Sequence, residues 1–194
     1  VLQKTKRAGI VALTQVAGRR QEEIGTYEIG FILAPRLNSM GRLETVLDSL
    51  RLLCTKNPTK AAELANKLNQ TNAIRQQMVM DTVVHARNQV LASSGGGLLF
   101  IAHESYHEGI VGLVASRLVD EFGRPAVVVS KGEEISRGSA RSIPGFNIVE
   151  LLDGAREFLV DGGGHPMAAG FTVRTKHLEL VSQAFRKHAE GNLN

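Results

Sequence analysis

The chain has 194 residues, of which 43% are hydrophobic and 22% charged, and this suits one large domain or two small ones. Its net charge of +4 is compatible with a polyanionic partner, while seven Phe, two Tyr and no Trp are too few for a broad base-stacking platform. The single cysteine, Cys54, excludes an internal disulfide and any zinc site that needs two cysteines, and it fits a reducing, cytoplasmic compartment. No apolar run reaches the length of a membrane span, so no membrane partner is expected.

The first part of the chain is predicted to be mainly helical. Apolar periodicity predicts a helix over residues 4–17, and Pro35, Asn38 and Gly41 predict an ordered loop over residues 34–43. Residues 45–54 are predicted to form a short buried helix, in which Cys54 is packed rather than reactive. The chain begins at a valine, without an initiator methionine or a signal-peptide pattern, so a piece of a longer protein is expected.

A long helix is predicted from Pro58 to about Leu91. Asn57 can cap its first turn, and Pro58 suits the first helical position. Because apolar residues cover only part of its circumference, we expect this helix to connect two bodies. The serine- and glycine-rich residues 93–97 then mark the clearest boundary in the chain.

Strand-type and helix-type runs alternate beyond this boundary. Strands are predicted at residues 98–102, 125–130, 135–142 and 171–173, and helices at residues 110–122 and 176–189. Such alternation is typical of an α/β domain.

The residues from His103 to His107 match the H-E-x-x-H pattern of zinc proteases. That pattern binds zinc only where both histidines share one face of a helix. Here a predicted strand runs directly into the pattern, and Gly109 and Gly112 follow it, each costing a helix about 1 kcal/mol. The sequence therefore disfavours a metalloprotease.

Two segments combine arginine with small or turn-forming residues. A strand over residues 136–142 would place Arg137, Ser139 and Arg141 on one face, as an anion site or as the charged outer face of an edge strand. In the predicted loop 34–43, Arg36 and Arg42 are available to a phosphate or to a structural ion pair at a domain junction.

A third segment, residues 162–170, holds three consecutive glycines followed by His165. Glycine tolerates positive φ and lets a ligand approach the backbone closely. One interpretation is a tight turn with a capping histidine; the other is an anion-binding concavity with the histidine as a donor at its rim. No carboxylate cluster of the kind found in two-metal nucleases occurs, because the aspartates are scattered singly.

Together these segments resemble the RecJ single-strand exonucleases of the DHH phosphoesterase superfamily. The matching residues are 35–38 (PRLN), 41–43 (GRL), 106–112 (YHEGIVG), 115–118 (ASRL), 123–125 (GRP), 138–142 (GSARS) and 163–171 (GGHPMAAGF). Their order and spacing agree over nearly the whole chain. Tyr106 stands where tryptophan is usual in the family, and Ser39 and Met40 stand where two small residues are usual.

The resemblance implies three parts: the helical tail of an N-terminal DHH domain (1–45), a helical connector (46–94) and a DHH-associated α/β domain with a mixed sheet (95–194). It implies that the Asp and His ligands for Mn²⁺ or Mg²⁺ belong to a DHH domain that this sequence does not contain. Residues 1–194 would then bind no metal and be inactive alone.

The intact enzyme of this family would hydrolyse single-stranded DNA from the 5′ end. Its further candidate partners are the missing DHH domain, a single-strand-binding protein and a helicase. Two alternatives stay open: a phosphodiesterase for short oligonucleotides or cyclic dinucleotides, and a non-catalytic nucleic-acid-binding module.

The resemblance also implies roles for particular residues. Ser139 and Arg141 would hold a phosphate. His165, as the catalytic-cleft residue, would steady the phosphate or nucleotide together with Gly163 and Gly164.

Three further positions follow from the same resemblance. Arg36 or Arg42 would add a phosphate contact near the junction between domains. His107 would face the cleft from the loop after a strand that ends at His103, which argues against the zinc-protease interpretation.

Overall fold

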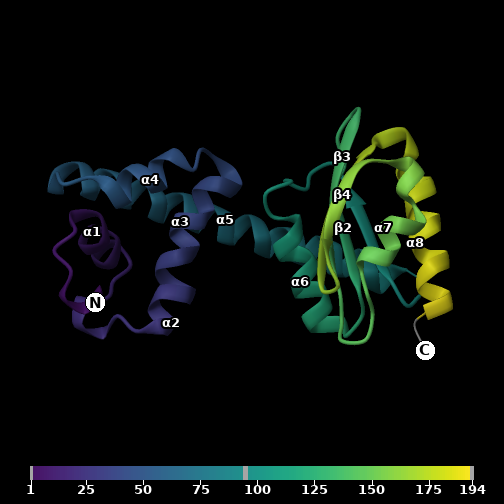
Figure 1. The fold of residues 1–194 in the computed structure, drawn as a ribbon, viewed down its shortest axis with the longest axis horizontal. Coiled ribbons are helices and arrows are strands. Elements are labelled where there is room, and N and C mark those ends of the chain that lie inside the picture. The colour runs from purple at the N-terminus through teal and green to yellow at the C-terminus, as the bar shows by residue number, and fades with distance from the viewer. Residues whose placement is uncertain (1, 94–95, 193–194) are drawn as a thin grey trace. The chain divides into compact units, whose positions relative to one another are not determined.

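A computed structural model describes residues 2–93 and 96–192 of the chain. The chain divides into two compact units, Val1–Met78 and Val79–Asn194, and the long helix α5 (Pro58–Ala92) contributes to both (Figure 1). Each unit has a hydrophobic core of its own.

The first unit is helical. Fully buried side chains at its centre include Leu13, Met40, Leu52 and Leu68. Besides the first part of α5, its elements are η1 (Leu2–Lys4), α1 (Ala8–Val16), η2 (Gln21–Glu23), α2 (Thr26–Glu28), the π-helical turn η3 (Ile29–Leu33), α3 (Ala34–Leu43) and α4 (Leu47–Cys54).

The predicted loop over residues 34–43 was wrong, because this segment is helix α3. Pro35 is near the start of α3, directly after the π-helical turn η3, and helical backbone continues through it. Gly41 lowers helix propensity, but Ser39 and Met40 are both fully buried. Tertiary packing of this face therefore outweighs the turn-forming residues that suggested a loop.

Helix α4 covers most of the predicted helix 45–54, but it is only half buried. Leu52 is inaccessible, whereas Leu47 and Leu50 are more than half exposed. Cys54 is also exposed, so the expectation of a packed cysteine was wrong. Residues spaced by three or four share a helix face, and Leu47, Leu50 and Cys54 lie together on the face turned away from the core.

Helix α5 confirms the predicted long helix and its cap. The Asn57 Oδ1 accepts a hydrogen bond from the N–H of Lys60 at 3.1 Å, and Pro58 is the first helical residue. No helix in the described parts of the chain combines the length and the apolar character that a bilayer crossing requires.

The second unit is built on a five-stranded mixed sheet with the strand order β1-β2-β3-β5-β4. Strand β2 runs parallel to β1, and every other neighbouring pair is antiparallel. The strands are β1 (Leu99–His103), β2 (Ala126–Ser130), β3 (Ile135–Arg141), β4 (Leu159–His165) and β5 (Ala168–Arg174). The predicted α/β fold with a mixed sheet is confirmed, although β4 was not predicted.

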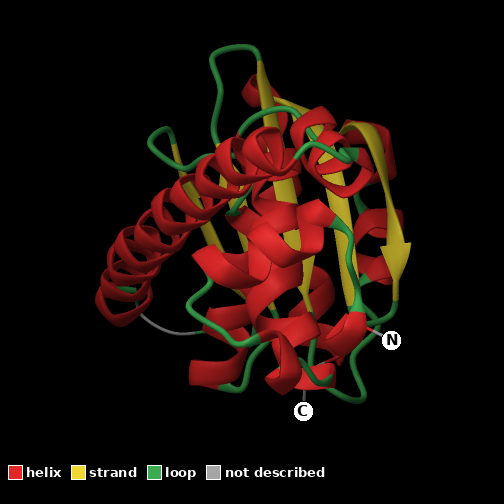
Figure 2. Ribbon diagram, turned by 90° about the vertical axis from the view of Figure 1, so that its left-hand side faces the viewer, coloured by secondary structure: helices red, strands yellow, loops and turns green. Residues whose placement is uncertain are grey.

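Helices lie on both faces of this sheet (Figures 1 and 2). Helix α6 (Val111–Phe122) packs on β2 and β3, and it ends at Gly123, whose positive φ of 62° suits a helix stop. Helices α7 (Val149–Gly154) and α8 (Leu178–Asn192) cover the opposite face, with the short turns η4 (Arg156–Phe158) and η5 (Thr175–His177) beside them.

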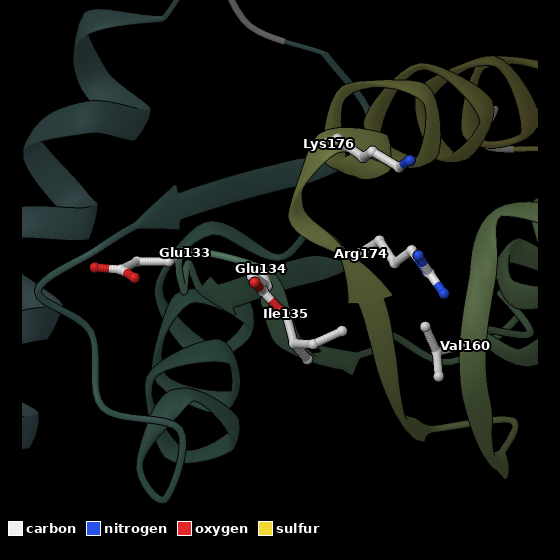
Figure 3. Close-up of a pocket in the computed structure, with 6 residues that line it drawn as sticks. All are labelled: Glu133, Glu134, Ile135, Val160, Arg174 and Lys176. Atoms are coloured by element: carbon white, nitrogen blue, oxygen red, sulfur yellow. The ribbon is translucent and has the colours of Figure 1, made fainter.

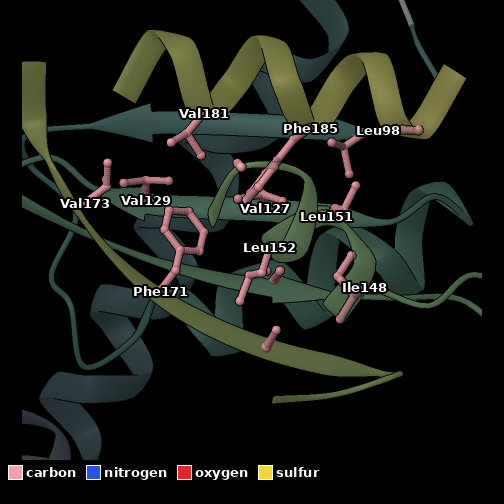
Figure 4. Close-up of a cluster of buried hydrophobic side chains, with 14 of the residues drawn as sticks. Leu98, Val127, Val129, Ile148, Leu151, Leu152, Phe171, Val173, Val181 and Phe185 are labelled. Carbon is pink, nitrogen blue, oxygen red and sulfur yellow. The ribbon is translucent and has the colours of Figure 1, made fainter. Parts of the chain in front are cut away.

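The main core fills the space between the sheet and helices α7 and α8 (Figure 4). Phe185 points from α8 toward the sheet, and its ring centroid lies 5.5 Å from that of Phe171 on β5. Val127, Val129 and Val173 are fully buried on the same sheet face. The space between the sheet and these two helices is therefore filled by packed side chains.

Candidate nucleic-acid interface

The strand register brings residues from two sequence motifs onto one face of the sheet. Ser139 on β3 lies opposite Gly170 on β5, which lies opposite Gly163 on β4. One row along, Arg141, Ala168 and His165 are aligned in the same way. Side chains directly opposite each other on neighbouring strands point to the same face.

We call this surface the open face. Alternation along the strands assigns to it Arg137, Ser139 and Arg141 of β3, Ala168, Gly170 and Thr172 of β5, and Asp161, Gly163 and His165 of β4.

Burial confirms that the open face is accessible. On β5 the half-buried Ala168, Gly170 and Thr172 alternate with the buried residues of the core side. On β4, both Gly163 and His165 are exposed. A ligand can therefore reach the sheet directly over β5 and β4.

Helix α6 begins beside the arginine and serine of this face. A Cβ atom added to Gly112, in the first turn of α6, would lie 2.9 Å from Nη2 of Arg141 and 3.1 Å from Oγ of Ser139. The glycine therefore allows the helix N-terminus to approach these two side chains closely. Helix N-termini carry partial positive charge and N–H donors, which suit an anion.

The role of Gly112 was not predicted. One sequence signal points to this role. A glycine near the start of a helix with a strong apolar stripe lowers helix stability, so its presence indicates that another part of the molecule must approach the backbone there.

The two arginines of β3 have different surroundings. Arg137 forms an ion pair with Glu108, in the turn before α6. Arg141 is half-buried, and its Nη1 donates a hydrogen bond to the carbonyl of Ala140 at 2.8 Å. Arg137 is therefore neutralised by a carboxylate at one end of the open face, and Arg141 lies with Ser139 and Gly112 nearer the other end.

The predicted glycine turn was wrong, because Gly162, Gly163 and Gly164 belong to strand β4 and none of them has a positive φ. The hairpin turn lies beyond them at Pro166 and Met167, between the paired residues His165 and Ala168. The reason is non-local: a run of glycines has no side-chain periodicity, and pairing with β5 makes it a strand.

The glycines of β4 have different surroundings. A Cβ atom on Gly164 would lie 2.3 Å from the carbonyl oxygen of Ala168 and 2.5 Å from Cα of Ala169. A Cβ atom on Gly163 would meet nothing within 4 Å. Gly164 is thus required by the hairpin itself, whereas Gly163 leaves a flat, open stretch of backbone on the open face.

His103 and His107 do not share a helix face, as expected. His103 is the last residue of β1, and its Nδ1 lies 2.8 Å from Oγ of Ser105. His107 lies in the turn before α6, where its Nδ1 accepts a hydrogen bond from the N–H of Gly109 at 3.0 Å. The zinc-protease interpretation is therefore excluded by geometry.

Tyr106 anchors the turn that carries His107. Its buried hydroxyl lies 2.8 Å from Nδ1 of His85 on α5, and its carbonyl accepts a hydrogen bond from Oγ of Ser130 at 2.6 Å. Burial raises the pKa of the Tyr106 phenol to about 12. The tyrosine therefore stays neutral and fixes the turn between α5 and β2.

Arg36 and Arg42 lie in the first unit, on helix α3. Arg36 donates from Nε to Oδ1 of Asn69 at 2.9 Å and from Nη1 to the carbonyl of Ile32 at 2.6 Å. Its pKa is lowered by burial and by the charge of Arg19. The hydrogen-bond partners of Arg36 are thus neutral groups rather than a carboxylate.

Arg42 is half-buried. The pKa of Arg75 is lowered first by burial and second by the positive charge of Arg42, which lies nearby. The first unit therefore brings cations near one another in two places, which favours anion binding there. Neither place decides between Arg36 and Arg42 as the phosphate contact.

A separate cavity of about 520 Å³ lies at the far end of β3 and β5 (Figure 3). Glu133 and Glu134 line it together with Arg174 and Lys176, so acidic and basic side chains are mixed. None of the sequence-predicted site residues lines this cavity.

The second unit matches a known domain family. The family model described as the DHHA1 domain matches residues 88–191, more than half of the chain, and the chain therefore belongs to this family.

The relatives within this family are RecJ proteins, which confirms the resemblance seen in the sequence. The "Single-stranded-DNA-specific exonuclease RecJ" of Bacillus subtilis (strain 168) is 38% identical over 195 residues, which cover 99% of this chain and 25% of that protein. The RecJ of Escherichia coli (strain K12) is 34% identical over 190 residues, 92% of this chain and 33% of that protein. The chain thus spans a quarter to a third of the length of these relatives.

A solved structure agrees with these matches. The crystal structure of RecJ from Thermus thermophilus in complex with Mg²⁺ superposes with a TM-score of 0.85 and 27% identity, covering 97% of this chain and 29% of that chain.

Proposed function

We propose that this chain is the substrate-binding portion of a RecJ-like exonuclease that hydrolyses single-stranded DNA in the 5′→3′ direction with Mn²⁺ or Mg²⁺. The observation that carries the proposal is the strand register, which aligns Ser139 and Arg141 with Gly163 and His165 on one accessible face. The names of the relatives, which are single-stranded-DNA-specific exonucleases, support the substrate class. Relatives with Mg²⁺ or manganese bound support the use of a divalent ion by the longer proteins.

The open face suits a phosphate at its β3 side. Arginine offers two parallel N–H donors to phosphate oxygens, and the hydroxyl of Ser139 adds a third donor. The nearby first turn of α6 contributes the positive end of its dipole. In this proposal Arg141 and Ser139 bind one phosphate of the DNA strand.

His165 acts at the β4 side of the same face. Two strand spacings separate it from Arg141, or about 10 Å between backbones, so the two side chains contact neighbouring parts of the strand. Gly163 and Gly170 between them expose backbone to the sugar and base. His165 then positions the nucleotide next to the bound phosphate.

The described residues do not supply a metal centre. No group of three or more His, Cys, Asp or Glu side chains in residues 2–93 and 96–192 is arranged to hold a metal ion. In the proposal, the divalent ion belongs to a DHH domain of the longer protein, and this portion holds and orients the DNA.

The proposal is tested by binding a fluorescent single-stranded oligonucleotide with a 5′-phosphate to residues 1–194. We expect weak binding that falls steeply between about 50 and about 200 mM salt, because phosphate contacts release counterions. A duplex of the same sequence is the control and should bind more weakly, since its paired bases cannot contact the exposed backbone of Gly163 and Gly170. Equal affinity for the duplex, or binding that ignores salt, contradicts the proposal.

A further inference from the structure

The two edges of the sheet are protected to different degrees. An edge strand exposes unpaired N–H and C=O groups, and proteins usually satisfy or cover them. On β4, the carbonyl of Gly162 accepts a hydrogen bond from Nη1 of Arg156 at 2.9 Å. The backbone N–H of Gly162 donates to Oδ1 of Asp161 at 2.9 Å. At Gly162 the β4 edge is therefore satisfied by neighbouring side chains.

The β1 edge has less of this protection among the described residues. Leu99 donates its N–H to Pro125, and the carbonyl of His103 accepts from the N–H of Lys131, so these alternate residues point their backbone toward β2. Phe100 and Ala102 then point their N–H and C=O groups away from the sheet. Among the described residues, their one partner on that side is Nη2 of Arg186, which lies 3.5 Å from the carbonyl of Phe100.

A groove of about 420 Å³ runs along this edge. Its lining includes Phe100 and Ala102 of β1 and, from α8, Leu178, Glu179, Ser182 and Arg186. Gln89 of α5 and Lys131 after β2 lie at its borders. The groove thus combines a strand edge, apolar and polar side chains, two cations and the carboxylate of Glu179.

We propose that this groove binds an extended peptide segment of a partner protein, which adds as a short strand to β1 and places an acidic side chain near Lys131 and Arg186. A peptide supplies both donors and acceptors at the spacing of a strand, as Phe100 and Ala102 require. A DNA backbone supplies no donor for their carbonyls. The proposal concerns a surface other than the open face and does not depend on the proposed nuclease function.

The first test uses ¹⁵N-labelled protein and two synthetic heptapeptides. Both alternate valine with a charged residue, which is aspartate in one and lysine in the other. We expect the aspartate peptide to shift the amide signals of Phe100 and Ala102 and to slow their hydrogen exchange, because these N–H groups become hydrogen-bonded. The lysine peptide should bind about tenfold more weakly, since its charge faces Lys131 and Arg186.

Variants decide whether the groove itself is responsible. Arg186→Glu should weaken binding of the aspartate peptide about five- to tenfold, and Lys187→Glu, an equal charge change on the next residue of α8, should not. Ala102→Pro removes the outward N–H of residue 102 and should also weaken binding of the aspartate peptide. A melting curve establishes that each variant is folded.

Several results would overturn the proposal. These are equal binding of both peptides, an equal effect of Arg186→Glu and Lys187→Glu, and signal changes confined to the open face. Displacement of the bound peptide by a single-stranded oligonucleotide would assign the groove to DNA. Concentration-dependent dimers that Ala102→Pro abolishes would assign it to a second copy of the chain.

Discussion

Arg141 is the residue on which the proposed phosphate contact most depends. It shares the open face with Ser139 and lies beside the first turn of α6. Arg141→Ala should weaken binding of single-stranded DNA and reduce the slope of log affinity against log salt by about 0.7, the value for one lost phosphate contact on a single strand. Titrations at several salt concentrations measure the slope.

The matched control for Arg141→Ala is Lys187→Ala, which removes one positive charge from helix α8 on the opposite side of the sheet. Its slope should stay close to that of the parent chain. Equal slopes for both variants would show that Arg141 acts only through the overall charge of the protein.

Lys67 makes the first unit sensitive to acid. Its Nζ contacts Oδ2 of Asp48 at 2.8 Å and Oε2 of Glu44 at 2.9 Å. These contacts lower the pKa of both carboxyls, helped by Arg51 at Asp48 and by the hydroxyl of Thr71 at Glu44. A carboxyl with a lowered pKa in the folded state contributes stability above its unfolded pKa, here 3.8 for Asp48. That stability is lost as the pH falls through the folded pKa.

We therefore expect the melting temperature of the first unit to fall between about pH 5 and about pH 2, and to fall less in Lys67→Met. Lys60→Met is the control, because Lys60 pairs only with the exposed Glu63. A Lys67→Met variant with the same pH profile as the parent chain would contradict this account.

At the scale of the element, the β4–β5 hairpin separates two roles of glycine. Gly164→Ala should destabilise the second unit by about 2 kcal/mol or more, because a Cβ atom there meets the backbone of Ala168 and Ala169. Gly163→Ala should change stability by less than about 1 kcal/mol, since its Cβ position is empty. Urea denaturation of the two variants measures the difference.

The same pair of variants addresses DNA binding. Gly163→Ala adds a methyl group to the open face between Ser139 and His165. This group should hinder contact with the DNA and weaken binding while leaving the fold intact. Equal losses of stability in the two variants would show that the hairpin tolerates neither methyl group, and that Gly163 is structural as well.

At the scale of the whole molecule, the prediction concerns activity. The chain covers a quarter to a third of its relatives, and its described residues supply no metal-binding cluster. Residues 1–194 should therefore bind single-stranded DNA but not degrade it in the presence of Mn²⁺. Release of nucleotides from a 5′-labelled strand measures this.

The Arg141→Ala variant distinguishes cleavage by the chain itself from cleavage by a trace of host nuclease. Cleavage that is unchanged in this variant comes from a contaminant. Metal-dependent cleavage that falls with Arg141→Ala would show that the chain itself holds the catalytic metals, against the proposal.

The sequence predicted most elements because their signals are local. The cap at Asn57, the stop at Gly123 and the apolar run of β2 each depend on a few neighbouring residues, and each is confirmed. The errors arose where distant contacts decide. Burial of Met40 makes a helix of a proline- and glycine-containing segment, and pairing with β5 makes a strand of Gly162 and its neighbours.

By itself, the sequence determined the family and the α/β class of the second unit, because these depend on the order of short motifs; the site residues that it proposed stay a prediction. The tertiary structure decided which of those residues share a surface. A strand points alternate side chains to opposite faces, so the face of Ser139, Arg141 and His165 depends on the register among β3, β5 and β4. That register results from long-range pairing and from the core beneath α7 and α8, which no local pattern encodes.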